Sequence, residues 1–264
     1  MPTVITEEVE LYYESKGDGI PLVFLHGFTL DRRMWRRQVD YFSGKYRALC
    51  YDSRGHGKSS CPKSGYSRQD RVTDLKNFAD RLSLERFHLV GLSMGGATAL
   101  GYAINYPERL LSLTLVDTAA GGYRPPGKYR DYREVALCKG VDEAKRRWIR
   151  TTLFFYANRN EDLREELADI MAGHCGHLWL DPRRGKYNDG DDVELSRKIK
   201  IPTLIFVGEK DRYFIPLART LHKNIEDSEL DVIPGVGHMS NMEAPERFNR
   251  RLEQFLERAE AKKN

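Results

Sequence analysis

The sequence has few cysteines, and none of them is paired in a recognisable motif. Its 264 residues include only Cys50, Cys61, Cys138 and Cys175. These four are scattered and form no Cys-x-x-Cys pair, so we expect neither a zinc finger nor a disulfide framework. The loop that contains His174, Cys175 and His177 holds a poor ligand set, so no metal site is expected there.

The chain also lacks a long apolar segment. A membrane helix needs about 20 consecutive apolar residues, and no run approaches that length. Residues 1–17 contain no apolar core of the kind found in signal peptides. We therefore expect a soluble, cytoplasmic protein with no membrane partner.

A large excess of one charge is missing as well. The net charge is +4, from 43 Lys and Arg against 39 Asp and Glu, and the two signs are interleaved. This pattern is typical of a solvated surface, so no nucleic-acid partner is expected. With 40% hydrophobic residues, the chain is long enough for one large α/β domain, or one domain with an insertion.

Strand and helix patterns alternate along most of the chain. Short buried strands separated by helices predict a parallel sheet with helices on both faces. Residues 119–201 break this rhythm, because they contain helix-like stretches and no convincing strand. We interpret them as a helical insertion over the carboxyl ends of the strands. The expected strands are 9–15, 21–27, 46–52, 87–92, 110–118, 202–211 and 228–237.

Polar residues with catalytic potential follow the predicted strands. Ligands of such sheets bind beyond the carboxyl ends of the strands, so a shared position there indicates a site. Asp52 begins a turn and is expected to bind backbone N–H groups of that turn. The residues at predicted strand ends are His26, Asp52, Ser93, Asp117, Asp211 and, in the segment after the last strand, His238.

The stretch from Phe87 to Ala103, FHLVGLSMGGATALGYA, joins a predicted strand to a predicted helix with Ser93 at the turn. Gly91 and Gly95 relieve crowding in so sharp a turn. Two interpretations are open from this segment alone. Ser93 is either a nucleophile exposed at the apex or the cap of an ordinary helix.

A serine nucleophile needs a base, a group that orients the base, and donors for the oxyanion. His238, in a glycine-rich loop after the last strand, is the candidate base. Asp211 is the candidate acid, although it also fits a turn or a helix cap. The candidate oxyanion donors are the backbone N–H groups of Met94, at a helix start, and Phe28.

Five motifs, FLHGFTLDRRMW, YDSRGHGKSS, GLSMGG, GEKDRYFIP and GVGHMSNMEAPERF, resemble those of the α/β-hydrolase superfamily, in the same order. The resemblance implies an α/β-hydrolase fold, with a mostly parallel eight-stranded sheet and a helical cap after the sixth strand. It implies a core of residues 1–118 and 202–264 and a cap of residues 119–201. It also assigns Ser93, Asp211 and His238 as the triad, with Phe28 and Met94 as oxyanion donors. Some members take the acid from the position of Asp117.

Within the superfamily the chain looks most similar to small-molecule carboxylesterases and 3-oxoadipate enol-lactonases. The resemblance implies hydrolysis of a small ester or lactone through an acyl-enzyme, with no cofactor or metal. The sequence does not indicate the oligomeric state, and a monomer or a homodimer is expected. Serine at the nucleophile position argues against dehalogenases and epoxide hydrolases that use aspartate. The alternatives are a carbon–carbon-bond hydrolase, a cofactor-free perhydrolase and a non-catalytic ligand receptor of the same fold.

Overall fold

The computed structural model describes residues 2–6, 8–126, 132–181 and 190–261. An eight-stranded sheet lies at its centre, with the strand order β1-β2-β4-β3-β5-β6-β7-β8. β1 and β2 pair antiparallel to their neighbours, and the other strands pair in parallel. The strands are β1 (Thr3–Ile5), β2 (Glu10–Lys16), β3 (Ile20–Leu25), β4 (Tyr46–Tyr51), β5 (Phe87–Leu92), β6 (Leu110–Val116), β7 (Thr203–Gly208) and β8 (Ser228–Ile233).

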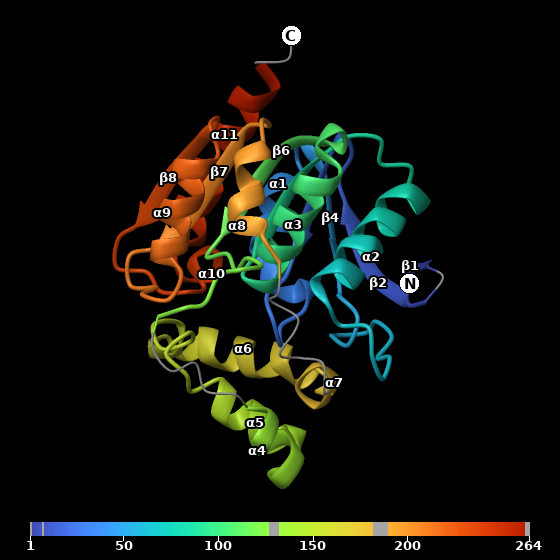
Figure 1. Ribbon diagram of the computed structural model, residues 1–264, viewed down its shortest axis with the longest axis vertical. Helices are drawn as coiled ribbons and strands as arrows, with labels where there is room; N and C mark the ends of the chain where they lie inside the picture. Colours follow the sequence, from blue (N-terminus) through green and yellow to red (C-terminus); the bar gives the residue numbers. More distant parts are fainter. Residues whose placement is uncertain (1, 7, 127–131, 182–189, 262–264) are drawn as a thin grey trace.

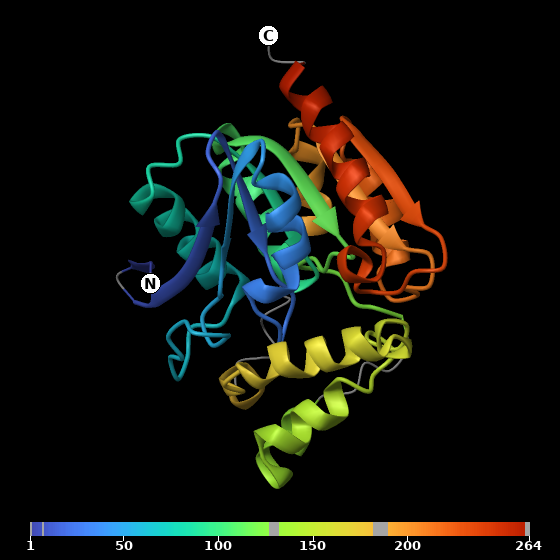
Figure 2. The same cartoon turned by 180° about the vertical axis from the view of Figure 1, so that it is seen from behind.

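Helices cover both faces of the sheet, as the alternating pattern predicted. Figure 1 shows α2 (Arg68–Arg81), α3 (Met94–Asn105) and α9 (Ile215–Asn224) over one face. Figure 2 shows α1 (Arg36–Phe42) and α11 (Pro245–Ala261) over the other, with the short α10 (Ser240–Glu243) just before α11. Every residue of β5 and β7 is buried as a result. That explains their continuous apolar runs, since both faces of these strands pack against helices.

Seven of the eight strands match the strands predicted from the sequence, and β1 was not predicted. This strand has only three residues and pairs with β2 at the edge of the sheet. Such a segment is too short to show the alternation by which a half-buried strand is identified. On the following segment, residues Arg32–Trp35 form a 3₁₀ turn directly before α1.

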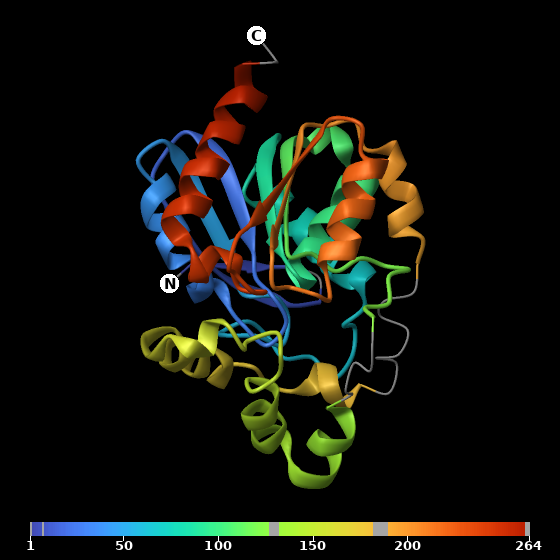
Figure 3. The ribbon, with the colours of Figure 1, turned by 90° about the vertical axis from the view of Figure 1, so that its left-hand side faces the viewer.

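A helical cap is inserted after the sixth strand. The described residues between β6 and β7 form α4 (Arg133–Lys139), α5 (Val141–Trp148), α6 (Glu161–Ala172), α7 (His177–Leu180) and α8 (Asp192–Leu195), with no strand among them. Figures 1 and 3 show α4 to α7 together beyond one end of the sheet, whereas α8 lies beside α3. The division of the chain at residues 119 and 201 stays a prediction.

The expectation about the cysteines was wrong. Cys61 and Cys175 form a disulfide although 114 residues separate them in the sequence. The fold brings the loop after β4 against the cap, and no local sequence pattern predicts this contact. Cys50 is buried and free, and Cys138 is exposed and free. In the part of the chain that the structure describes, no helix is long and apolar enough to cross a membrane.

Candidate active site

The polar residues expected at strand ends lie where the pattern placed them. Four of them, His26, Asp52, Ser93 and Asp117, directly follow β3, β4, β5 and β6. Asp211 and His238 lie in the loops after β7 and β8. Because β3 to β8 are parallel, these ends share one edge of the sheet. Figure 2 shows the arrowheads of β6 and β8 pointing toward the cap.

Ser93 occupies a strained turn between β5 and α3. Its φ of 54° and ψ of −109° lie in a region that side chains rarely adopt. The backbone is fixed by hydrogen bonds from Ser93 N to Val116 O at 3.0 Å and from Ala97 N to Ser93 O at 2.9 Å. The Ser93 side chain makes no capping hydrogen bond to α3. The interpretation of Ser93 as an ordinary helix cap is therefore wrong.

The two flanking glycines are required by close backbone contacts. A Cβ atom on Gly95 would lie 2.6 Å from the carbonyl oxygen of His26, at the end of β3. A Cβ atom on Gly91 would lie 2.8 Å from the backbone nitrogen of Gly96. Neither neighbour is a flexible side chain, so only glycine fits at either position. The turn can therefore pack α3 directly against β3 and β5.

Asp211 and His238 form a buried hydrogen-bonded pair. His238 Nδ1 lies 2.6 Å from Asp211 Oδ2, and the two residues are 4% and 3% exposed. The ring of Phe214 stacks on the imidazole at 5.0 Å. The other oxygen, Asp211 Oδ1, accepts the backbone N–H groups of Tyr213 and Phe214 at 3.2 and 3.3 Å. The carboxylate thus binds both the backbone of the turn and the histidine. The sequence had suggested these two roles of Asp211 as alternatives.

The pKa of His238 is raised above its ordinary value of 6.5. Burial alone would lower it, but the negative charge of Asp211 and the hydrogen bond to it, together with the charges of Asp117 and Glu243, outweigh burial. Glu243 fixes the loop around the histidine by accepting the N–H groups of Gly237 at 2.8 Å and Met239 at 3.0 Å. The pair is therefore held by both its own hydrogen bond and its flanking backbone.

A second carboxylate, that of Asp117, lies behind this pair. One oxygen atom of Asp117, one of Asp211 and a ring nitrogen of His238 lie within 4.8 Å of one another. Asp117 accepts the Gly208 N–H at 2.8 Å and contacts the Ser240 hydroxyl at 2.5 Å. Burial and the neighbouring Asp211 raise its pKa well above the usual range. Asp211 therefore has the direct bond to His238, and Asp117 does not.

Ser93 is linked to this cluster through the backbone. Its N–H binds Val116 O, and Val116 immediately precedes Asp117. Ser93 Oγ makes no hydrogen bond to His238 or to any other described residue. Such contacts are often long in sites without substrate and shorten when substrate binds. The serine is half-buried, so a substrate can reach it.

The two candidate oxyanion donors lie on different elements. Met94 is the first residue of α3, where a backbone N–H has no partner within the helix. Phe28 follows β3 and precedes Thr29, whose φ is 66°. The Thr29 N–H binds His56 Nε2 at 3.2 Å, and the Thr29 hydroxyl accepts the Trp148 indole N–H at 2.8 Å. Core and cap together therefore fix the loop that carries Phe28.

Cap residues also surround the Phe28 ring. The rings of His174, Trp179 and Trp148 lie edge-on to it, with centroids 5.2, 5.4 and 5.6 Å away. Trp148, Phe154 and Trp179 are buried in the cap, whereas Phe155 is 55% exposed. The pKa of His56, packed between His26 and His174, lies well below 6.5 because of burial.

Sequence reasoning missed several groups that support the site. Asp52 behaves as expected, since it accepts the backbone N–H groups of Arg32 and Lys58. The contacts of Phe214, Ser240 and Glu243 were not anticipated. The only signal for Glu243 was its place in the His238 motif, because its partners are backbone groups that the sequence does not distinguish.

The geometry defines a class of protein, and comparison with known proteins agrees. Residues 22–251 match the model of the alpha/beta hydrolase family, so the chain belongs to that family. It is 30% identical over 267 residues to 3-oxoadipate enol-lactonase 2 of Acinetobacter baylyi, covering 97% of this chain and 96% of the relative.

Two further comparisons show the range of the family. The chain is 31% identical over 267 residues to the 2-hydroxy-6-oxononadienedioate hydrolase of Paraburkholderia phymatum, covering 94% of this chain and 91% of the relative. The solved structure of a thermophilic esterase from Thermogutta terrifontis, with malate bound, superposes with a TM-score of 0.85. It is 29% identical and covers 97% of each chain.

Proposed function

We propose that the protein hydrolyses carboxylic esters or lactones of small molecules through an acyl-enzyme on Ser93. The buried pair of Asp211 and His238, at the same sheet edge as a serine on a strained turn, carries this proposal. The similarity to an enol-lactonase and to an esterase supports the ester class of substrate. A relative's substrate alone does not define the acyl group of this one.

The proposed reaction has two halves. His238 takes the proton of Ser93 as the hydroxyl oxygen attacks the ester carbonyl carbon, and the N–H groups of Phe28 and Met94 hold the oxyanion. The carbon–oxygen bond to the alcohol breaks, and the alcohol leaves with the proton from His238. Water then attacks the acyl-enzyme, and the same histidine takes the proton of the water and returns it to Ser93. Asp211 stabilises the imidazolium in both halves.

The test is turnover of p-nitrophenyl esters of graded acyl length by the wild type and by Ser93→Ala. We expect the variant to lose at least about 10⁴-fold in kcat, because the nucleophile and the base act as a unit. An unchanged far-ultraviolet circular dichroism spectrum is the control that the variant is folded. A serine-directed phosphonate should add once to the wild type, at Ser93 by peptide mass. Most of the turnover surviving in the variant would contradict the proposal.

A second candidate is hydrolysis of a carbon–carbon bond by the same residues. The relative from Paraburkholderia phymatum supports it, since its named substrate contains ketone and carboxylate groups and no ester. Parallel assays on esters and on 2-hydroxy-6-oxo-dienoates separate the two. Labelling at Ser93 with no turnover of any ester, together with turnover of the dienoate, would favour this second function.

A further inference from the structure

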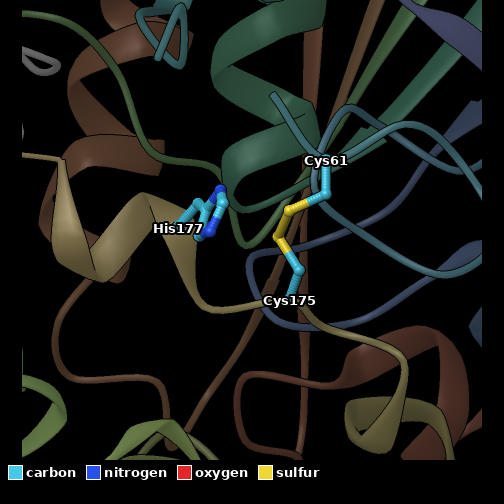
Figure 4. A group of neighbouring side chains, drawn as sticks. All are labelled: Cys61, Cys175 and His177. Carbon is cyan, nitrogen blue, oxygen red and sulfur yellow. A yellow bond between two sulfur atoms is a disulfide. The ribbon is translucent and has the colours of Figure 1, made fainter. Parts of the chain in front are cut away.

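The disulfide ties the cap to the core close to the candidate active site. Cys61 lies in the loop between β4 and α2, and Cys175 lies in the cap just before α7. Their Cα atoms are 6.5 Å apart, and Figure 4 shows the bond with His177 beside it. Neither cysteine residue is buried, so the disulfide lies near the surface of the protein and not in its core.

We use the name clamp segment for residues 173–179, which run from the end of α6 into α7. Besides the disulfide, hydrogen bonds join this segment to the loop after β4. Cys175 N donates to Gly55 O at 3.1 Å, and His174 Nδ1 lies 3.2 Å from the same oxygen. His177 Nδ1 lies 3.0 Å from Pro62 O. Each of these is a single hydrogen bond to a carbonyl oxygen, whereas the disulfide is covalent.

The clamp segment contacts the side chains of both residues whose backbone N–H groups are the candidate oxyanion donors. His174 and Trp179 pack against the ring of Phe28. Leu178 belongs to a small buried cluster with Tyr66 and Met94, against which Phe28 also packs. The Tyr66 hydroxyl lies 3.6 Å from Cys61 Sγ and 4.0 Å from Cys175 Sγ. The disulfide therefore borders the same cluster that contains Met94.

We propose that Cys61 and Cys175 are a reversible thiol–disulfide site whose oxidised form holds the clamp segment on the oxyanion donors. The effect on turnover rests on the proposed function; the effect on the placement of the cap does not. The reagents are low-molecular-weight thiols and disulfides. Reduction removes the only covalent link between the cap and the loop after β4 in the described part of the chain.

The chemistry balances with a small disulfide as oxidant. One cysteine thiolate attacks a sulfur of the small disulfide, which forms a mixed disulfide and releases one small thiolate. The second cysteine thiolate then attacks the mixed disulfide and releases the second. The two protein sulfurs together lose two electrons, the small disulfide gains them, and the two thiol protons end on the released thiols. Reduction by a dithiol is the reverse exchange.

The experiment compares the protein after equilibration with oxidised glutathione and with dithiothreitol. EDTA is present throughout, because the two sulfurs and a ring nitrogen of His177 lie within 4.8 Å of one another and the reduced thiols would take up metal ions. Alkylation after denaturation, read by intact mass with any glutathione adduct on the exposed Cys138 counted as one thiol, should count two thiols, Cys50 and Cys138, in the oxidised protein and four in the reduced protein.

Reduction should lower the Tm by about 5–10 °C, since a cross-link over a long loop restricts the unfolded chain. It should lower kcat/KM for a p-nitrophenyl ester by about tenfold, less than the 10²–10³ that follows removal of an oxyanion donor. Cys61→Ser and Cys175→Ser should behave like the reduced wild type in both buffers. Cys138→Ser, an exposed cysteine on α4, should keep the full response.

Four alkylated thiols in the oxidising buffer would overturn the proposal, and so would a Tm that is the same in both states. The Tm and the thiol count need no substrate. If the Tm responds to reduction but neither state turns over any ester, the thiol–disulfide site stands and the ester function fails. If ester turnover is normal and identical in both states, the link to the oxyanion donors is wrong.

Discussion

Backbone strain is concentrated at the candidate site. Among the described residues, four that are not glycine have positive φ, and three of them, Thr29, Ser93 and Asp117, border the site. Such conformations cost about 1–3 kcal/mol each and persist only where the surroundings enforce them. Here the enforcing contacts are backbone hydrogen bonds from Ser93 and a contact between Thr29 and His56. The strained backbone orients the side chains of these three residues and does not stabilise the fold.

Two carboxylates were possible acids, and their variants should differ. Asp211→Asn should lower kcat by about 10⁴, because the amide cannot hold the imidazole in the productive tautomer. Asp117→Asn should stay within about tenfold of the wild type, since Asp117 binds Gly208 and Ser240 and asparagine accepts its φ of 42°. Steady-state kinetics on one ester measures both. A larger loss of kcat in Asp117→Asn than in Asp211→Asn would identify Asp117 as the acid.

The pH profile should report His238. The base works only when neutral, so kcat/KM should rise with pH through the pKa of His238, with a midpoint above 6.5. In Asp211→Asn the largest attraction that raises this pKa is gone, while burial and the smaller effects of Asp117 and Glu243 remain, so the midpoint should move to lower pH. Residual kcat/KM measured from pH 5 to 9 checks this. If the midpoint does not move in the variant, a group other than His238 controls the rise of kcat/KM with pH.

At the scale of elements, the sharp turn after β5 is possible because α3 packs directly against backbone atoms of β3 and β5, with no side chain between them. Gly95 faces carbonyl oxygens at the end of β3, and Gly91 faces the first turn of α3. This contact places the amino terminus of α3, with the N–H of Met94, at the carboxyl edge of the sheet. The position of this candidate oxyanion donor therefore depends on the packing of two elements.

Gly95→Ala should destabilise the protein by about 1–3 kcal/mol, because the new Cβ meets backbone 2.6 Å away at His26. Gly44→Ala is the matched control, since a Cβ there has no heavy atom within 4 Å and Gly44 has no positive φ. It should change stability by less than about 0.5 kcal/mol. Urea unfolding compares the two. Equal stabilities would show that α3 can move away from β3.

For the whole molecule, the cap completes the site instead of only covering it. The indole of Trp148, at the end of α5, donates to Thr29 in the loop after β3, 119 residues away. Trp148→Phe removes this hydrogen bond and retains an aromatic ring. A net loss of about 1 kcal/mol should lower kcat/KM about fivefold.

Phe155→Leu is a suitable control for Trp148→Phe, because Phe155 is exposed on the same cap. It should leave kcat/KM unchanged within experimental error. Both variants should give one cooperative thermal transition, which excludes loss of the cap. If both variants lose turnover equally, the effect would come from the cap surface and not from the bond to Thr29.

Much of the architecture followed from local patterns. Continuous apolar runs such as β5 and β7 indicated strands buried on both faces. Residues of catalytic types at the ends of the strands indicated a site at the carboxyl edge of the sheet. The three-residue β1 was missed because it is too short to show a period. The Glu243 and Phe214 contacts were missed because a backbone N–H or a ring face is the same chemical group at many positions.

The sequence by itself determined which residues follow which strand, and parallel pairing then brings those residues to one edge. It also determined the turn around Ser93, because the two glycines and the serine lie within five residues of one another. The motifs favoured Asp211 over Asp117, but only the tertiary structure decided the hydrogen bond between Asp211 and His238 and the pairing of Cys61 with Cys175. Both depend on how segments more than 20 residues apart pack together. The chain's local pattern does not encode those distances, since they follow from the sum of many burial and packing terms.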